Sequence, residues 1–174
     1  MAKFDRGSGA RAKVGPGGGE DAMGVEASIR TLIAFLHDEL ATVASYRRAL
    51  PGFAEAPDGD ELRACLASHE RRIATLKQRI RFLGGDPNDE KEMGENDDDA
   101  SATTPSPPGL GVGSDAADAA ITALEASEDR GLKHYLDDVC KLDRDTRSLV
   151  AREILPEQVR TYDSLTDLKL TRRL

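Results

Sequence analysis

The chain of 174 residues has the length of one small domain and is long enough to bury a hydrophobic core. Aromatic residues make up 4 % of the sequence and Trp is absent, so we expect a core of Leu, Ile, Val and Ala side chains. Charged residues make up 32 %, but no basic region or long apolar run is present, which argues against binding to nucleic acid or to a membrane.

Two helices are predicted in the first half of the chain, after a tail. Residues 1–23 are rich in Gly, Ser and scattered charges, and we predict that they are disordered. Helices are expected over 25–50 and 59–83, because apolar residues recur there at intervals of three and four. Pro51-Gly52 predicts the end of the first helix, and Gly84-Gly85 predicts the end of the second.

The next segment, 84–114, contains many Gly, Asp and Pro residues and has no helical periodicity. Its part from Asp86 to Asp99 holds eight acidic residues and one lysine, so almost all of the net charge of −8 belongs to this segment. We predict a disordered acidic loop. Its length allows it to run along a helical bundle and to connect two parallel helices, as a crossover connection does.

Two further helices are predicted in the second half, over 115–140 and 144–170. The fourth helix has the less regular apolar pattern, and Pro156 within it removes one backbone hydrogen bond, so we expect a kink or a break. Each half has a short turn between its helices, and the long loop joins the second helix to the third. This order predicts one all-α domain over 24–174, an antiparallel four-helix bundle with one long crossover.

Each predicted helix carries one polar residue near the middle of its apolar stripe. These residues are Glu39, His69, Glu128 and Gln158. Because stripe positions face the interior of a bundle, where an unpaired charge is costly, we predict that the four side chains form one buried polar layer. Arg72, which lies one helical turn after His69, is expected to belong to the same layer as a cation.

The two halves of the chain repeat this polar pattern. A tyrosine follows each glutamate by seven residues, Tyr46 after Glu39 and Tyr135 after Glu128. In both halves, thirty residues separate the glutamate from the polar residue of the next helix. The repetition predicts a pseudo-two-fold arrangement. Because seven residues span two helical turns, each tyrosine hydroxyl is expected to donate to a carboxylate of the facing helix.

Several segments resemble ferritin-like proteins. LHDELATVASYRRA is similar to the first bundle helix of bacterioferritins and rubrerythrins, and RIRFLGGDPN resembles the end of their second helix. ALEASEDRGLKHYLDDV and LDRDTRSLVAREILPEQVRTYDSL are similar to an uncharacterised bacterial group, the domain of unknown function 2383 family. The resemblance covers residues 26–85 and 117–169, and it implies a bacterial protein with a ferritin-like fold.

The resemblance also implies where a metal centre would lie. Ferritin-like di-iron sites use one Glu from each of two helices and a Glu-x-x-His pair from each of the other two. Glu39 and Glu128 match the lone glutamates, with Glu125 as a second candidate on the third helix. The Glu-x-x-His positions read His69-x-x-Arg72 and Gln158-x-x-Thr161, so neither pair is present. We therefore expect the usual di-metal centre to be lost.

Three interpretations of the polar layer stay open. In the first, a buried network of ion pairs and hydrogen bonds fixes the register of the helices without a metal. In the second, an altered site binds iron or another divalent metal through some of five candidate ligands: Glu39, His69, Glu125, Glu128 and Glu157. In the third, the layer transfers protons in catalysis, although the sequence suggests no catalytic residue or organic cofactor.

The sequence thus favours a ferritin-like bundle protein of unknown physiological role, without enzymatic activity and with weak or altered metal binding. A first alternative is a helical interaction module, which binds a helical protein or a second copy of itself through an exposed apolar stripe on the fourth helix. A second alternative is an iron-binding oxidase or ferroxidase with a non-standard ligand set. Cys65 and Cys140 lack metal-site spacing, which favours free buried thiols in a reducing cytoplasm.

Overall fold

The computed structural model describes residues 18–54, 56–88 and 114–172. Within these ranges the chain forms helices and turns and contains no strand, which confirms the predicted all-α class. The predicted segments 1–17 and 89–113, of the tail and of the acidic loop, lie outside the described residues. No helix of the described part combines the length and the apolar character that a membrane span requires.

Four long helices correspond to the four predicted ones, and shorter helical segments flank them. The long helices are α1 (Gly18–Ala49), α2 (Asp58–Phe82), α3 (Ser114–Asp138) and α5 (Leu155–Thr171). The shorter segments are the 3₁₀ turns η1 (Leu50–Phe53) and η3 (Val139–Lys141), the helix α4 (Arg144–Leu149) and the π-helical turn η4 (Val150–Ile154).

The start of α1 differs from the prediction. The helix begins at Gly18, so residues 18–23, which we predicted as part of a disordered tail, are helical and that prediction is wrong for them. The sequence over these residues is GGEDAM. The Gly-rich run ends at Gly19, and residues 20–23 that follow it are compatible with a helix.

The end of α2 confirms the prediction made from Gly84-Gly85. Gly84 has a φ of 90°, a left-handed conformation that glycine adopts without steric cost. The amide of Gly84 donates to the carbonyl of Arg81 over 3.0 Å, and that of Gly85 donates to the carbonyl of Ile80 over 3.0 Å. These two bonds form a Schellman motif, which satisfies carbonyl groups at the end of the helix.

The predicted fourth helix is divided, and its irregular turn lies before Pro156. Asp143 caps the start of α4, and its carboxylate accepts from the amides of Asp145 and Thr146, each over 3.0 Å. The chain then widens into the π-helical turn η4, and Pro156 stands in the first turn of α5. A proline ring clashes with the carbonyl four residues before it, and a wider turn relieves that clash.

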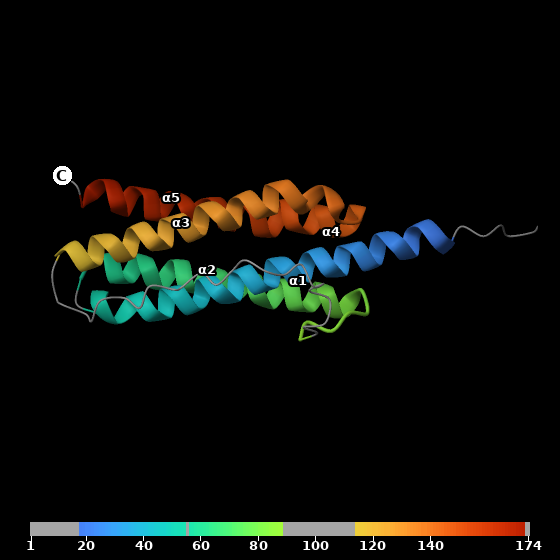
Figure 1. The fold of residues 1–174 in the computed structure, drawn as a ribbon, viewed down its shortest axis with the longest axis horizontal. Helices are drawn as coiled ribbons and strands as arrows, with labels where there is room; N and C mark the ends of the chain where they lie inside the picture. Colours follow the sequence, from blue (N-terminus) through green and yellow to red (C-terminus); the bar gives the residue numbers. More distant parts are fainter. Residues whose placement is uncertain (1–17, 55, 89–113, 173–174) are drawn as a thin grey trace, which may run out of the picture.

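The long helices lie alongside one another (Figure 1). Helix α1 contacts both α2 and α3, and α5 contacts both α3 and α2. Segments that are far apart in the sequence therefore pack together, and buried side chains of all four long helices contribute to the interior.

Buried apolar side chains form two clusters. The first contains Leu32, Ile33, Phe35, Leu36, Leu76, Ile80, Tyr135, Leu142, Val150 and Ile154. The second contains Tyr46, Phe53, Leu62, Cys65, Ile121, Leu124 and Leu165. On each helix of the predicted polar layer, the polar residue lies between a member of one cluster and a member of the other, as Glu39 does between Leu36 and Tyr46. The polar layer therefore divides the core.

The two cysteines are free, but their environments differ. Cys65 is buried in the second cluster, as we expected, whereas Cys140 lies in the η3 turn and is exposed. The expectation of a buried thiol is therefore wrong for Cys140. The third helix was predicted to reach residue 140, but α3 ends at Asp138 and does not carry its apolar stripe that far.

Candidate functional site

The candidate site is a polar layer that all four long helices build in the middle of the core. Glu39 lies on α1, His69 on α2, Glu128 on α3 and Gln158 on α5, and each is at most 3 % exposed. They are buried because each occupies a stripe position whose helical neighbours on the same face are apolar core residues. Four buried polar side chains need partners from one another, and the structure provides them.

His69 connects the two carboxylates of the layer. Its Nδ1 atom lies 2.7 Å from Oε2 of Glu39, and its Nε2 atom lies 2.6 Å from Oε1 of Glu128. A protonated imidazole, which donates from both ring nitrogens, satisfies a carboxylate at each of them. Burial by itself lowers the pKa of His69, but the hydrogen bonds to Glu128 and Glu39 outweigh burial and raise that pKa above its ordinary value.

Arg72 is the second cation of the layer and is 2 % exposed. Its Nε atom donates to Oε1 of Glu39 over 2.8 Å, and its Nη1 atom donates to Oγ of Ser68 over 3.1 Å. Its Nη2 atom lies 2.6 Å from Nδ1 of His69, so two donors face each other there. This repulsion is offset by the two carboxylates, and we assign the protonated imidazole because it gives the layer two negative and two positive charges.

The two glutamates are ionised for the same reason. Burial raises the pKa of Glu39, but the hydrogen bond from His69 and the positive charge of Arg72 bring it below its ordinary value. Burial likewise raises the pKa of Glu128, and the hydrogen bond from His69 and the charge of its ring bring it below its ordinary value. Opposite charge and donated hydrogen bonds thus stabilise both carboxylates in a dry environment.

The two tyrosines donate across the layer to the glutamate of the opposite helix. The Tyr46 hydroxyl on α1 donates to Oε1 of Glu128 on α3 over 2.7 Å. The Tyr135 hydroxyl on α3 donates to Oε1 of Glu39 on α1 over 2.8 Å. Burial and the neighbouring carboxylates raise the pKa of both phenols far above the ordinary value, so both remain donors. The reciprocal pairs have the geometry that the seven-residue spacing predicts.

Helix α5 completes the layer with neutral donors to Glu128. Gln158 Nε2 donates to Oε2 of Glu128 over 2.7 Å and to its carbonyl over 3.1 Å. Thr161 Oγ1 donates to the same Oε2 over 2.9 Å. Thr161, at one of the expected Glu-x-x-His positions, and Ser68 were not predicted to belong to the layer. The signal for Thr161 was its interval of 33 residues from Glu128, which equals the interval from Glu39 to Arg72.

Two of the five candidate metal ligands lie outside the layer. Glu125 forms an ion pair with Lys169. Glu157 accepts from Ser68 over 2.5 Å, from Arg71 over 2.9 Å and from Arg160 over 2.6 Å. The structure therefore brings together three of the five candidates, and the remaining two have basic partners of their own.

The arrangement of the layer does not fit a divalent metal. Among the described residues, no group of three or more His, Cys, Asp or Glu side chains is placed so that it could hold a metal ion. A metal bound by His69 together with Glu39 and Glu128 would need a lone pair on the imidazole, whereas both ring nitrogens contact carboxylates. The Arg72 guanidinium, a fixed positive charge, lies against His69 and Glu39. The position that a cation would take is occupied by the protein's own cations.

Chemically, the layer is a network of protonated donors on two ionised acceptors, closed off from solvent. Its protons lie in short hydrogen bonds between groups that are each at most 3 % exposed. Comparison of the chain with protein-family models, with curated proteins and with solved structures gives no match.

Proposed function

We propose that this protein is an antiparallel, ferritin-like four-helix bundle in which a charge-balanced polar layer replaces a lost di-metal centre. In this proposal the protein performs no oxidase or ferroxidase chemistry, and the layer serves to fix how the four helices pair. The observation that carries the proposal is the placement of Arg72 and His69, two cations, directly against Glu39 and Glu128.

The packing of the helices supports the bundle part of the proposal. Contacts join α1 to α2 and α3, and α5 to α3 and α2, as expected for four helices around one core. In Figure 1 the chain runs in one direction through α1 and α5 and in the opposite direction through α2 and α3. Hydrogen bonds at intervals of 30 and 33 residues recur in both halves, which supports a pseudo-two-fold relation.

A metal-loading experiment tests the proposal. The protein is purified without chelator, its metal content is measured by elemental analysis, and thermal unfolding is followed with and without EDTA. We expect less than stoichiometric iron, manganese or zinc and no shift of the melting temperature on chelation. A near-stoichiometric metal content would contradict the proposal and favour the oxidase or ferroxidase alternative.

A matched variant serves as the positive control. The four substitutions His69→Glu, Arg72→His, Gln158→Glu and Thr161→His restore both Glu-x-x-His pairs of a ferritin-like site. We expect this variant to bind divalent metal and to lose thermal stability when EDTA is added. If the folded variant binds no more metal than the wild type, the ferritin-like arrangement of the helices is wrong.

The interaction-module alternative gains no specific support. The large exposed apolar side chains of the described residues are distributed over four helices, as Leu40, Phe82, Leu136, Val159 and Leu170. Only two of them, Val159 and Leu170, belong to the predicted fourth helix, so they do not form the stripe that we expected there. Binding to a helical partner or to a second copy stays a prediction.

A further inference from the structure

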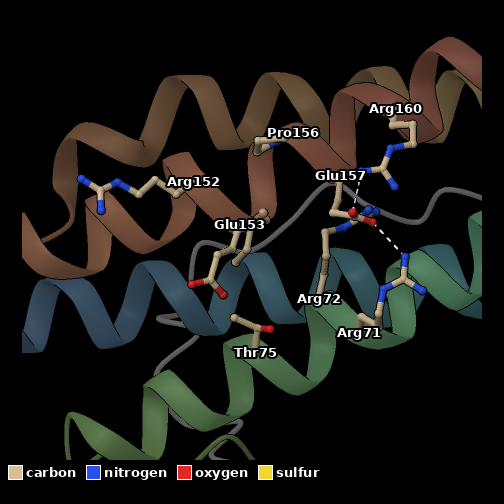
Figure 2. A pocket seen from close by; sticks show the side chains of 9 residues that line it. Arg71, Arg72, Thr75, Arg152, Glu153, Pro156, Glu157 and Arg160 are labelled. Atoms are coloured by element: carbon tan, nitrogen blue, oxygen red, sulfur yellow. Dashed lines mark hydrogen bonds and ion pairs between the residues drawn. The ribbon is translucent and has the colours of Figure 1, made fainter.

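A cleft with several arginines lies between α2 and the segment formed by η4 and α5 (Figure 2). Its volume is about 380 Å³, and it is open to solvent. Neither the polar layer nor the proposed loss of the metal centre gives this cleft a role. It is lined by Arg71, Arg72, Thr75, Arg152, Glu153, Ile154, Pro156, Glu157 and Arg160.

One end of the cleft already binds a carboxylate, that of Glu157. Arg71 Nη2 donates to one of its oxygens over 2.9 Å, and Arg160 Nη2 donates to the other over 2.6 Å. Hydrogen bonds from Ser68 and from both arginines lower the pKa of Glu157 to about 2. Two guanidinium groups from different helices thus converge on one fully ionised oxyanion.

At the Glu157 end of the cleft, two positive charges, of Arg71 and Arg160, face the single negative charge of Glu157. Arg71 and Arg160 share its single negative charge and are 61 % and 64 % exposed, so they keep unused N–H donors in contact with solvent. Arg72 borders the cleft from the side of the layer, where Glu39 balances it. Figure 2 places Glu153 nearer to Thr75, away from Arg71 and Arg160. An external anion at the Arg71–Arg160 end therefore meets two guanidinium groups and one carboxylate, that of Glu157, with which it competes for their donors.

The cleft end lies next to the π-helical turn, because η4 and Pro156 directly precede this part of α5. On α5, Gln158 and Thr161 contact the layer, whereas Glu157 and Arg160 line the cleft. π-helical turns inside α-helices frequently mark functional sites.

We propose that the cleft binds the phosphate group of a small soluble ligand, with Arg71 and Arg160 as direct donors and Glu157 as an internal competitor. Guanidinium groups bind phosphate oxygens through paired N–H donors, and a phosphate dianion offers more acceptor sites and more charge than a carboxylate. The space around the arginines exceeds what a bare phosphate fills, which fits a phosphate monoester. The inference is independent of the ferritin-like proposal, because it uses no residue of the lost metal centre as a ligand.

The cleft is connected to the buried layer through Ser68. Its hydroxyl contacts Glu157 on the cleft side over 2.5 Å and Arg72 on the layer side over 3.1 Å. A phosphate that draws Arg71 and Arg160 away from Glu157 changes the hydrogen bonding of Ser68 and hence the surroundings of Arg72. The imidazole signals of His69, 2.6 Å from Arg72, therefore report on occupancy of the cleft.

The test is a titration of the folded full-length protein with inorganic phosphate at constant ionic strength, followed by calorimetry and by the His69 imidazole signals in NMR. Arg71→Gln and Arg160→Gln should each weaken phosphate binding by at least about tenfold, the effect of one lost charge-assisted hydrogen bond. Glu157→Gln removes the competitor and should strengthen binding, while it keeps a side chain that can bond Ser68. Arg48→Gln, at an exposed arginine of α1, is the matched control and should change nothing.

The ligand class is tested with glycerol phosphate and with acetate in the same assay. We expect glycerol phosphate to bind at least as tightly as inorganic phosphate, and acetate to bind at least about tenfold more weakly. Three results would overturn the proposal: weaker binding by Glu157→Gln, an equal loss in Arg48→Gln, or acetate binding as tight as that of phosphate. Absence of any heat or signal change with wild type and Glu157→Gln would overturn it as well.

Discussion

The half of the layer built by α1 and α2 and the half built by α3 and α5 have the same spacing but different chemistry. In each half, donors that lie 30 and 33 residues after the glutamate hydrogen-bond its carboxylate. In the first half both donors are cations, and in the second half both are neutral. The donors are, in chain order, His69, Arg72, Gln158 and Thr161.

The difference gives the two halves opposite charge. With His69 protonated, the α1–α2 half carries one negative and two positive groups, whereas the α3–α5 half carries the single negative group of Glu128. His69 joins the halves, because it donates to Glu39 of its own half and to Glu128 of the other. Charge balance is therefore a property of the complete layer, and either half alone would bury an unbalanced charge.

Arg72 gives the largest expected effect in a test of this comparison. Arg72→Met leaves one cation against two buried carboxylates, and we expect a loss of about 3–5 kcal/mol in the free energy of unfolding, measured by urea denaturation. The counterpart in the other half, Thr161→Val, removes one neutral donor from Glu128, which keeps its other partners, and should cost less, about 1.5–3 kcal/mol. Equal losses would show that the halves do not differ in charge as described.

Glu128 tests how far the neutral half depends on His69. Glu128→Leu leaves the imidazolium with only one carboxylate and removes the acceptor for Tyr46, Gln158 and Thr161, so we expect a loss of about 3–5 kcal/mol. Glu128→Gln keeps the shape and an acceptor oxygen and should lose less, about 1–3 kcal/mol. Urea denaturation measures both. Wild-type stability in both variants would mean that Glu128 is not part of a buried network.

The tyrosines test a feature that both halves share, the hydrogen bond from a tyrosine hydroxyl to the glutamate of the opposite half. Tyr46→Phe and Tyr135→Phe each remove one hydrogen bond to an ionised carboxylate and leave the ring in place. We expect similar losses of about 1.5–3 kcal/mol in the two variants, measured by urea denaturation. A loss in one variant only would contradict the pseudo-two-fold relation, because the two pairs are reciprocal.

The pH dependence of the free energy of unfolding tests the charge of His69, and its expected effect is the smallest per pH unit. The pKa of His69 is raised in the folded protein, so its contribution is complete below about 6.5 and is lost as the pH rises through the folded value. The slope is at most about 1.4 kcal/mol per pH unit. The lowered pKa values of Glu39 and Glu128 act in the opposite direction: their contribution is present above about 4.5 and is lost as the pH falls through the folded values.

Unfolding free energies between pH 5 and pH 9 measure this dependence. The difference between wild type and His69→Gln should shrink as the pH rises, because the wild type loses the charge that the variant never had. His134→Gln, at a histidine outside the layer that pairs with Asp38, is the control and should leave the pH profile of the layer unchanged. A difference that grows as the pH rises from 5 to about 6.5 would mean that His69 is neutral in the folded protein, and a constant difference would mean that its pKa is not raised.

The helical periodicity of the sequence and its helix-ending glycines predict much of this structure. The spacing of apolar residues locates α2 and α3 to within a few residues, and Gly84-Gly85 correctly marks the end of α2. It misses the start of α1, and it gives one helix over 144–170 where the chain forms α4, η4 and α5. A polar residue at a stripe position must face the interior, so the burial of Glu39, His69, Glu128 and Gln158 follows from periodicity alone. The equal intervals in the two halves also place each tyrosine near the opposite glutamate.

The tertiary structure alone decides which charges meet and where the helix axis is irregular. Periodicity gives the face and height of a side chain, but the partner of a long side chain depends on how the helices rotate and approach. Glu157, one residue before Gln158, therefore leaves the candidate ligand set and pairs with Arg71 and Arg160. The π-helical turn before Pro156 is a compromise between a backbone clash and the packing of α5, and no local pattern specifies it.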